Sequence, residues 1–140
     1  MTEQAIVIDF LGTIVDPLRL KVYPETEQAL KKLKENFDVF VSSVSGVAFI
    51  EEHLKKQKLD KIVFLIYGRE DGDKHDHLEK VLRFGDYEKV LYIASIPEDF
   101  EIEDEKVVKI AVNACTPEAF SKDVIVFKEP LSVKIVEQII

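Results

Sequence analysis

Short apolar runs alternate with amphipathic segments along the whole chain. Most of the apolar runs are continuous instead of alternating with polar residues, which is typical of strands buried on both faces of a parallel sheet. These runs predict six strands, at residues 5–9, 38–42, 62–67, 90–94, 107–112 and 125–127. The pattern therefore indicates a sheet that other elements cover on both sides.

Apolar residues at helical spacing predict the covering elements. Helices are expected at residues 26–35, 47–57, 74–84 and 131–140, with a short helix starting at residues 116–118. Pro24 suits a first helical position, Ser45 a helix N-cap, and Gly85 the residue that follows a helix end. Strands that alternate with helices predict an α/β fold, a three-layer Rossmann-like sandwich with a mostly parallel sheet. The length, without a linker-like tract, predicts a single domain over residues 1–140.

Composition narrows the classes of partner. The 140 residues carry a formal net charge of -8, which argues against nucleic acid, because such a partner requires a positive surface. No apolar run approaches the ~20 residues that span a bilayer, and the N-terminus lacks the basic region of a signal peptide. We therefore expect a cytoplasmic protein with no membrane partner.

Cys115, the only cysteine, cannot form an internal disulfide and is predicted to be a small core residue. Few amides beside many lysines and glutamates favour a thermophile.

Chemically active side chains fall where the predicted strands end. The first strand ends at Asp9, the second at Ser42, and the helix after the third strand begins at Lys74. Ser95 and Asp99 follow the fourth strand. The carboxyl ends of parallel strands form the ligand-binding edge of open α/β sheets, so we expect these side chains to meet there. Their chemistry suits a phosphate-like anion, with a carboxylate nucleophile, a hydroxyl and an ammonium for the charged oxygens, and distal acids for a cation.

This set of strand ends resembles the haloacid dehalogenase-like (HAD) superfamily, and the resemblance covers nearly the whole chain. Members of that superfamily are mostly Mg²⁺-dependent phosphatases that act through an aspartyl-phosphate. Their first motif, a strand followed by Asp-x-Asp-Gly-Thr, is matched by DFLGT at residues 9–13. The resemblance implies that Asp9 is the nucleophile and that Gly12 and Thr13 are structural residues of the motif. It also implies that Ser42 and Lys74, which match the second and third motifs, bind phosphate.

Two positions depart from the family's pattern. Leu11 stands where the family has its general acid/base aspartate, and loss of such a group typically costs about 10²–10⁴-fold in rate. Ser95 stands where the fourth motif has its first Mg²⁺-binding aspartate, whereas Asp99 keeps the second acidic position. A neutral hydroxyl is a poor Mg²⁺ ligand. The resemblance therefore implies a weakened metal site with Asp9 and Asp99 as its acidic ligands.

A non-acidic residue after the nucleophile, with serine in the fourth motif, also occurs in the dehalogenase branch of the family, which uses no metal. Dehalogenases of that branch are larger proteins with a helical cap over the substrate. In this chain one loop, helix and strand use up each gap between the first three motifs, so no cap domain is expected. The site should then be open unless a neighbouring subunit covers it, which leaves a homo-oligomer as an alternative.

Three functional hypotheses follow. The leading one is a HAD-like protein with degenerate catalytic motifs, in which phosphatase activity is lost or greatly reduced and binding of a phosphorylated small molecule or macromolecule is retained. The first enzyme alternative is a weak Mg²⁺-dependent phosphohydrolase that acts through an aspartyl-phosphate on Asp9. The second is metal-independent, dehalogenase-like hydrolysis that uses Asp9 and Asp99. The sequence leaves open whether the chain is an enzyme.

Overall fold

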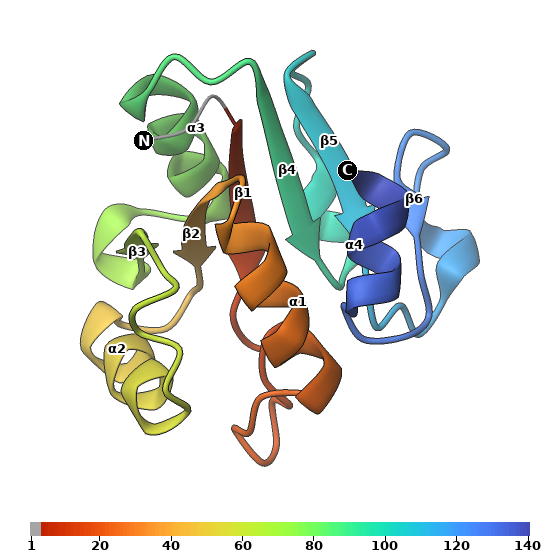
Figure 1. The fold of residues 1–140 in the computed structure, drawn as a ribbon. Helices are drawn as coiled ribbons and strands as arrows, with labels where there is room; N and C mark the ends of the chain where they lie inside the picture. The colour runs from red at the N-terminus through yellow and green to blue at the C-terminus, as the bar shows by residue number, and fades with distance from the viewer. Residues whose placement is uncertain (1–3) are drawn as a thin grey trace.

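A six-stranded, all-parallel sheet forms the centre of the protein (Figure 1). The computed structural model describes residues 4–140. The strand order is β3-β2-β1-β4-β5-β6, so the first strand lies in the interior of the sheet and the chain winds outwards to both edges. The strands are β1 (Gln4–Asp9), β2 (Asp38–Ser42), β3 (Leu65–Tyr67), β4 (Lys89–Ala94), β5 (Val107–Ala111) and β6 (Ile125–Val126).

Helices cover both faces of the sheet, which makes three layers (Figure 1). On one face, α1 (Pro24–Lys34) and α4 (Val133–Ile139) contact each other, and α2 (Val47–Lys56) buries Ile50 and Leu54 in the same core. On the other face, α3 (Lys74–Phe84) packs against β1 and β2. Short 3₁₀ turns are η1 (Arg69–Asp71), η2 (Pro97–Phe100) and η3 (Pro117–Ala119). The predicted three-layer α/β fold is confirmed, with a sheet that is parallel throughout.

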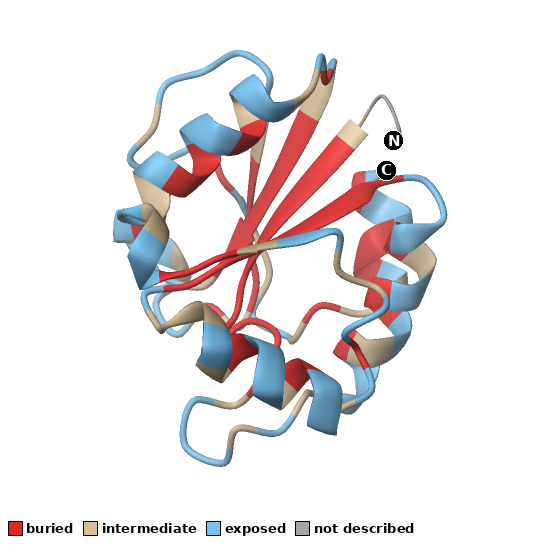
Figure 2. Ribbon diagram, turned by 90° about the vertical axis from the view of Figure 1, so that its left-hand side faces the viewer, coloured by how far each residue is buried: buried red, intermediate tan, exposed pale blue. Residues whose placement is uncertain are grey.

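Successive residues of β1 supply the two cores. Ile6 and Ile8 belong to the core under α1, α2 and α4, whereas Ala5 and Val7 belong to the core under α3. Because side chains alternate between the faces of a strand, Asp9 falls on the α3 face. Figure 2 shows that the strands are buried along most of their length, while the helices keep an exposed outer side. Asp9 therefore lies at the carboxyl end of β1, on the face of the sheet that α3 covers.

Some helix and strand boundaries in the structure differ from the predicted ones. β3 covers residues 65–67 instead of 62–67, because the chain before it is still turning: the Ile62 N–H donates to the Leu59 carbonyl at 3.1 Å. Pro24 opens α1 as predicted. Gly85 caps α3, but in an extended conformation with φ −140°. Within residues 4–140, no helix combines the length and the apolar character needed to cross a membrane.

Two residues have different roles from those predicted. Gly46, not Ser45, is the N-cap of α2, and it has no side chain to satisfy the helix N-terminus. The Glu70 carboxylate accepts from the Val47 N–H at 3.0 Å and does this from a distant segment, which local sequence does not reveal. Cys115 is exposed and not in the core, because it lies in the loop that leaves β5 for η3.

Candidate functional site

Asp9 and Ser42 are neighbours at the carboxyl edge of the sheet. They are paired in register across β1 and β2, and both are buried. Next to them, α3 begins at Lys74, because the Asp73 side chain accepts from the Asp76 N–H at 2.9 Å and the Asp76 side chain accepts from the Asp73 N–H at 2.9 Å. This reciprocal capping box fixes the start of α3 and with it the position of Lys74.

The charged centre of the site consists of Asp9, Lys74 and Asp99. The Lys74 Nζ is 3.2 Å from Asp9 Oδ1 and 2.9 Å from Asp99 Oδ2. Asp99 comes from η2, the turn that follows β4, and only 7% of it is exposed, compared with 5% of Asp9. Two carboxylates around one ammonium carry one net negative charge when all three are ionised. Lys74 is thus already the counter-ion of both acids.

Burial makes Asp9 a weak acid for a carboxyl group. Loss of water raises the pKa of Asp9 to about 6; the Lys74 charge opposes this rise, while the Asp99 charge adds to it. Burial, the largest single influence on Lys74, lowers its pKa, but the two carboxylates together outweigh burial and the net shift is upward. Lys74 therefore stays protonated at neutral pH, whereas Asp9 takes up a proton only slightly below neutrality.

A chain of hydroxyl groups connects Asp9 to the loop after β1. The Thr13 Oγ1 lies 3.4 Å from Asp9 Oδ2 and 2.7 Å from the Ser95 Oγ, which in turn lies 2.8 Å from the Gly12 carbonyl oxygen. Two hydroxyl protons serve these three contacts. The Ser95 hydroxyl donates to the Gly12 carbonyl, so the single Thr13 proton is shared between the Ser95 Oγ and the longer contact with Asp9 Oδ2. Ser95 and the ionised Asp9 therefore compete for the Thr13 proton.

The Gly12 carbonyl also accepts from the Asn113 Nδ2 at 3.0 Å. Gly12 has φ +86°, in the left-handed region that favours glycine, and Asn113 has φ +52° just after β5. The loop after β1 is thus held from the ends of β4 and β5 at the same time. Ser95 is therefore not a free polar group: its hydroxyl is one of the contacts that hold this loop.

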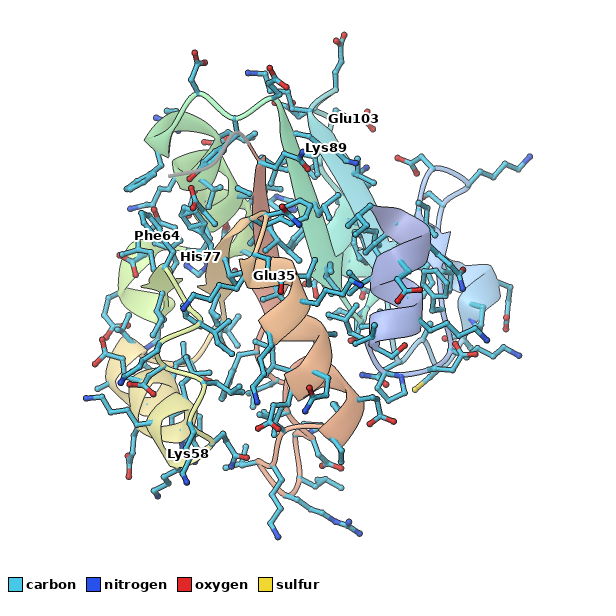
Figure 3. All side chains as sticks on the ribbon, in the orientation of Figure 1. Glu35, Lys58, Phe64, His77, Lys89 and Glu103 are labelled. Atoms are coloured by element: carbon cyan, nitrogen blue, oxygen red, sulfur yellow. The ribbon has the colours of Figure 1, made fainter. Side chains whose placement is uncertain are left out.

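Ser42 belongs to a separate, uncharged network (Figure 3 labels His77 between α3 and β2). The Ser42 Oγ is 2.7 Å from the His77 Nδ1, and the His77 Nε2 is 2.8 Å from the Gly68 carbonyl oxygen. A carbonyl can only accept, so Nε2 carries the proton and Nδ1 of the neutral ring is an acceptor. Burial lowers the pKa of His77, which keeps the ring neutral. Ser42 therefore donates its hydroxyl proton to His77.

The donor set does not fit Mg²⁺. Leu11 is apolar and packs against the core, the Ser95 hydroxyl is bonded to Gly12 and Thr13, and the Lys74 ammonium lies between the two carboxylates. Mg²⁺ requires a nearly octahedral shell of oxygen ligands. Within the part of the chain that the structure describes, no group of three or more His, Cys, Asp or Glu side chains is arranged to hold a metal ion.

An open cavity of about 380 Å³ adjoins the charged centre. Its walls are formed by Val44, Asp73, Lys74, His75, Ile96, Glu98 and Asp99.

The Tyr92 hydroxyl is buried and has no hydrogen-bond partner. Among residues 4–140 it is the single buried side-chain N or O atom without one. Burial raises the pKa of Tyr92, and the charges of Asp99 and Asp9 add to that rise, so the orphaned hydroxyl lies in the field of the two acids.

The structure brings most of the predicted site residues together, and it shows which contacts each of them makes. Asp9, Lys74 and Asp99 form one cluster, and Thr13 and Ser95 adjoin it. Ser42 is next to Asp9, yet its hydroxyl is bonded to His77. Gly12 takes part through its carbonyl, and Leu11 only through packing.

Three residues of the site were not found from the sequence. They are His77, Tyr92 and Asn113. His77 follows Lys74 by three residues on the same helix, a spacing that brings two side chains to one helix face and was the available signal. Tyr92 and Asn113 gave no signal of this kind, because their roles depend on contacts with distant parts of the chain.

Comparison with known proteins adds no relative: no family model, no curated protein and no solved structure matches the chain.

Proposed function

We propose that the chain is a HAD-like protein in which phosphatase activity is lost or greatly reduced, and whose carboxyl-edge site binds a ligand without hydrolysing it. The observation that carries this proposal is the position of the Lys74 ammonium between Asp9 and Asp99. Phosphoryl transfer relies on positive charge around the transferred group. Here the one lysine of the cluster is shared by two acids, which leaves the cluster with a net negative charge.

The residues around this cluster support the proposal. A phosphate oxygen needs a hydrogen-bond donor, but the Ser42 proton is directed to His77. The Ser95 hydroxyl is occupied by Thr13 and Gly12, and Leu11 has no proton to transfer. Asp9 keeps the place of a nucleophile, but the one cation beside it, Lys74, is shared with Asp99, and no acid stands at position 11 to protonate the leaving group.

The direct test is hydrolysis of a generic aryl phosphate by the full chain, with and without millimolar Mg²⁺. We expect no turnover above that of the matched variant Asp9→Asn. Heat denaturation of both proteins confirms that they are folded. Turnover that depends on Mg²⁺ and disappears in Asp9→Asn would favour the weak phosphohydrolase instead.

A double substitution tests the two positions, Leu11 and Ser95, at which the aspartates of the HAD motifs are replaced. Leu11→Asp with Ser95→Asp adds two oxygen ligands beside Asp9 and Asp99, so Mg²⁺ should raise the melting temperature of the variant but not of the wild type. We expect hydrolysis to remain absent, because Ser42 still donates to His77. Recovery of aryl phosphate turnover in this variant would show that an intact phosphate cradle was present all along.

Metal-independent hydrolysis is the second candidate, and one observation favours it. Lys74 supplies a cation that contacts both carboxylates, and Asp9 is ionised above a pH of about 6. Halide release from a small 2-haloacid without added metal, compared between wild type and Asp9→Asn, tests this candidate. Release above the Asp9→Asn level would make the protein a hydrolase and contradict binding without turnover.

A further inference from the structure

We infer that two copies of the chain associate through the edge strand β3, which pairs antiparallel with β3 of the second copy and continues the sheet across a two-fold axis. Three features of the molecule lead to this interface. They are an unprotected sheet edge, an apolar groove beside it, and charges whose order along two helices complements itself when the chain direction is reversed. No residue that lines this groove also lines the cavity beside Lys74.

The edge strand β3 is open to pairing. Among the strands of residues 4–140 it lies at one end of the sheet and pairs with β2 alone. The outer backbone groups of an edge strand are a template for another strand, and proteins usually protect such edges with charges, proline or a bulge. Residues 62–67 read IVFLIY, without a charge or a proline. Figure 2 is viewed from the side of β3, which is exposed at its beginning and buried at its end.

The opposite edge of the sheet is protected. The strand β6 has two residues, and Lys122 and Asp123 precede it, while a lysine, a glutamate and a proline follow at residues 128–130. Each copy therefore has one edge that is suited to strand pairing. An interface that uses the same surface on both copies is closed by a two-fold axis, so assembly stops at a dimer.

An apolar groove follows the open edge. An open cavity of about 510 Å³ lies between α2 and residues 63–66, and its apolar lining includes Val47, Leu54 and Leu65. Phe64 is 47% and Leu65 37% exposed. From the α3 side, Phe84 is 45% exposed, and its ring centroid lies 5.5 Å from that of Phe64, which Figure 3 labels. A strand added to β3 would remove these apolar side chains from water, which favours association.

The charges on α2 favour a second copy as the partner. Glu51 and Lys55 line the groove one helical turn apart, with the acid nearer the N-terminus of α2 and the base nearer its C-terminus. Both are exposed, and neither belongs to an ion pair within the described residues. A two-fold axis places the two α2 helices antiparallel. Glu51 of each copy then approaches Lys55 of the other.

The helix α3 has the same order of charges on the other face of the sheet. An open cavity of about 580 Å³ beside Tyr67 is lined by Glu79 and, further along α3, by Lys80 and Arg83. The exposed Glu79–Arg83 ion pair within one copy contributes little, so it does not oppose an exchange of partners. Any extended strand can pair with a backbone edge, but a reversed copy supplies complementary charge on both faces of the sheet as well.

Sedimentation velocity of the full chain, from micromolar to submillimolar concentration, tests the pairing. We expect an equilibrium between monomer and dimer with no larger species. Leu65→Lys places a charge on the shared edge and should raise the dimer Kd by about tenfold or more. Ile125→Lys makes the same change on the β6 edge, at a residue that is 45% exposed, and should leave the Kd unchanged. A wild type that is monomeric at every concentration, assembly beyond the dimer, or equal effects of the two substitutions would overturn the inference.

Charge reversal on α2 tests the two-fold arrangement without altering β3. Glu51→Lys places a lysine opposite Lys55 of the second copy and should raise the dimer Kd several-fold. The double variant with Glu51→Lys and Lys55→Glu reverses the order of the charges and should restore the wild-type Kd. Both positions are exposed, so these variants examine the interface even if Leu65→Lys does not fold. A double variant that dimerises as weakly as Glu51→Lys would contradict the antiparallel placement of the two α2 helices.

Discussion

Asp9 has two flanks with opposite properties. On the β2 side, Ser42, His77 and Gly68 form a closed, neutral chain in which every proton has an acceptor. On the β4 side, two hydroxyl protons serve the three contacts of Thr13 and Ser95, and the longest of these contacts, at 3.4 Å, ends on Asp9 itself. The comparison shows that one flank fixes hydrogen-bond direction regardless of Asp9, while the other depends on whether Asp9 is protonated.

Breaking the closed flank should have the largest effect. His77→Leu leaves the Ser42 hydroxyl buried without its partner and removes one of the two donors to the Gly68 carbonyl, which keeps the Asp71 N–H at 2.9 Å. We expect a loss of about 2–4 kcal/mol in the free energy of unfolding. Urea denaturation measures it. His75→Leu, two residues away and outside this network, is the control and should cost much less. Equal losses would mean that the neutral chain is not what stabilises this flank.

The open flank should instead respond to pH. The folded-state pKa of Asp9, about 6, lies above the ordinary value of 3.8 for an aspartate, so the folded protein binds this proton more tightly than the unfolded chain. The resulting stability is present below pH 4 and is lost as pH rises through 6, by up to about 3 kcal/mol. The variant Asp9→Asn has no ionisable group at this position, so it cannot lose this stability as the pH rises.

The stability of Asp9→Asn relative to wild type should therefore increase between pH 4 and pH 7. Acids with lowered pKa values, such as Asp16 and Asp73, give the opposite dependence at lower pH, but both proteins share them and they cancel in the difference. Urea denaturation at the two pH values measures this. Parallel pH curves for the two proteins would mean that Asp9 does not hold its proton more tightly after folding.

The smallest effect is expected from Ser95→Ala. Its loss of stability should be about 1 kcal/mol, because the site of Ser95 is only partly buried. The sharper readout is the pKa of Asp9, followed by carboxyl ¹³C NMR. Without Ser95, the Thr13 proton is free to stabilise the ionised Asp9, so the pKa should fall. Ser121→Ala, at an exposed position, is the control, and an unchanged pKa in Ser95→Ala would disconnect the hydroxyl chain from Asp9.

The strands and their burial in a parallel sheet could be predicted from the sequence, because burial on both faces leaves continuous apolar runs, as in β2 and β4; the order of the strands was not predicted. The positions of Asp9, Lys74 and Asp99 followed from the rule that parallel strand ends converge. The hydrogen-bond partners of the site residues could not be predicted from this rule. Whether Ser42 faces a ligand or His77 depends on how closely α3 approaches β2, and local patterns contain no measure of that distance. Glu70, which replaces the predicted cap of α2, illustrates the same limit.

The position of β1 between β2 and β4 has a kinetic consequence for the site. Asp9 is the last residue of a strand with partners on both sides, and the next amide, of Phe10, donates to the Ser42 carbonyl at 3.2 Å. Such interior backbone opens only together with most of the fold, so the Phe10 amide should exchange its hydrogen as slowly as global unfolding allows.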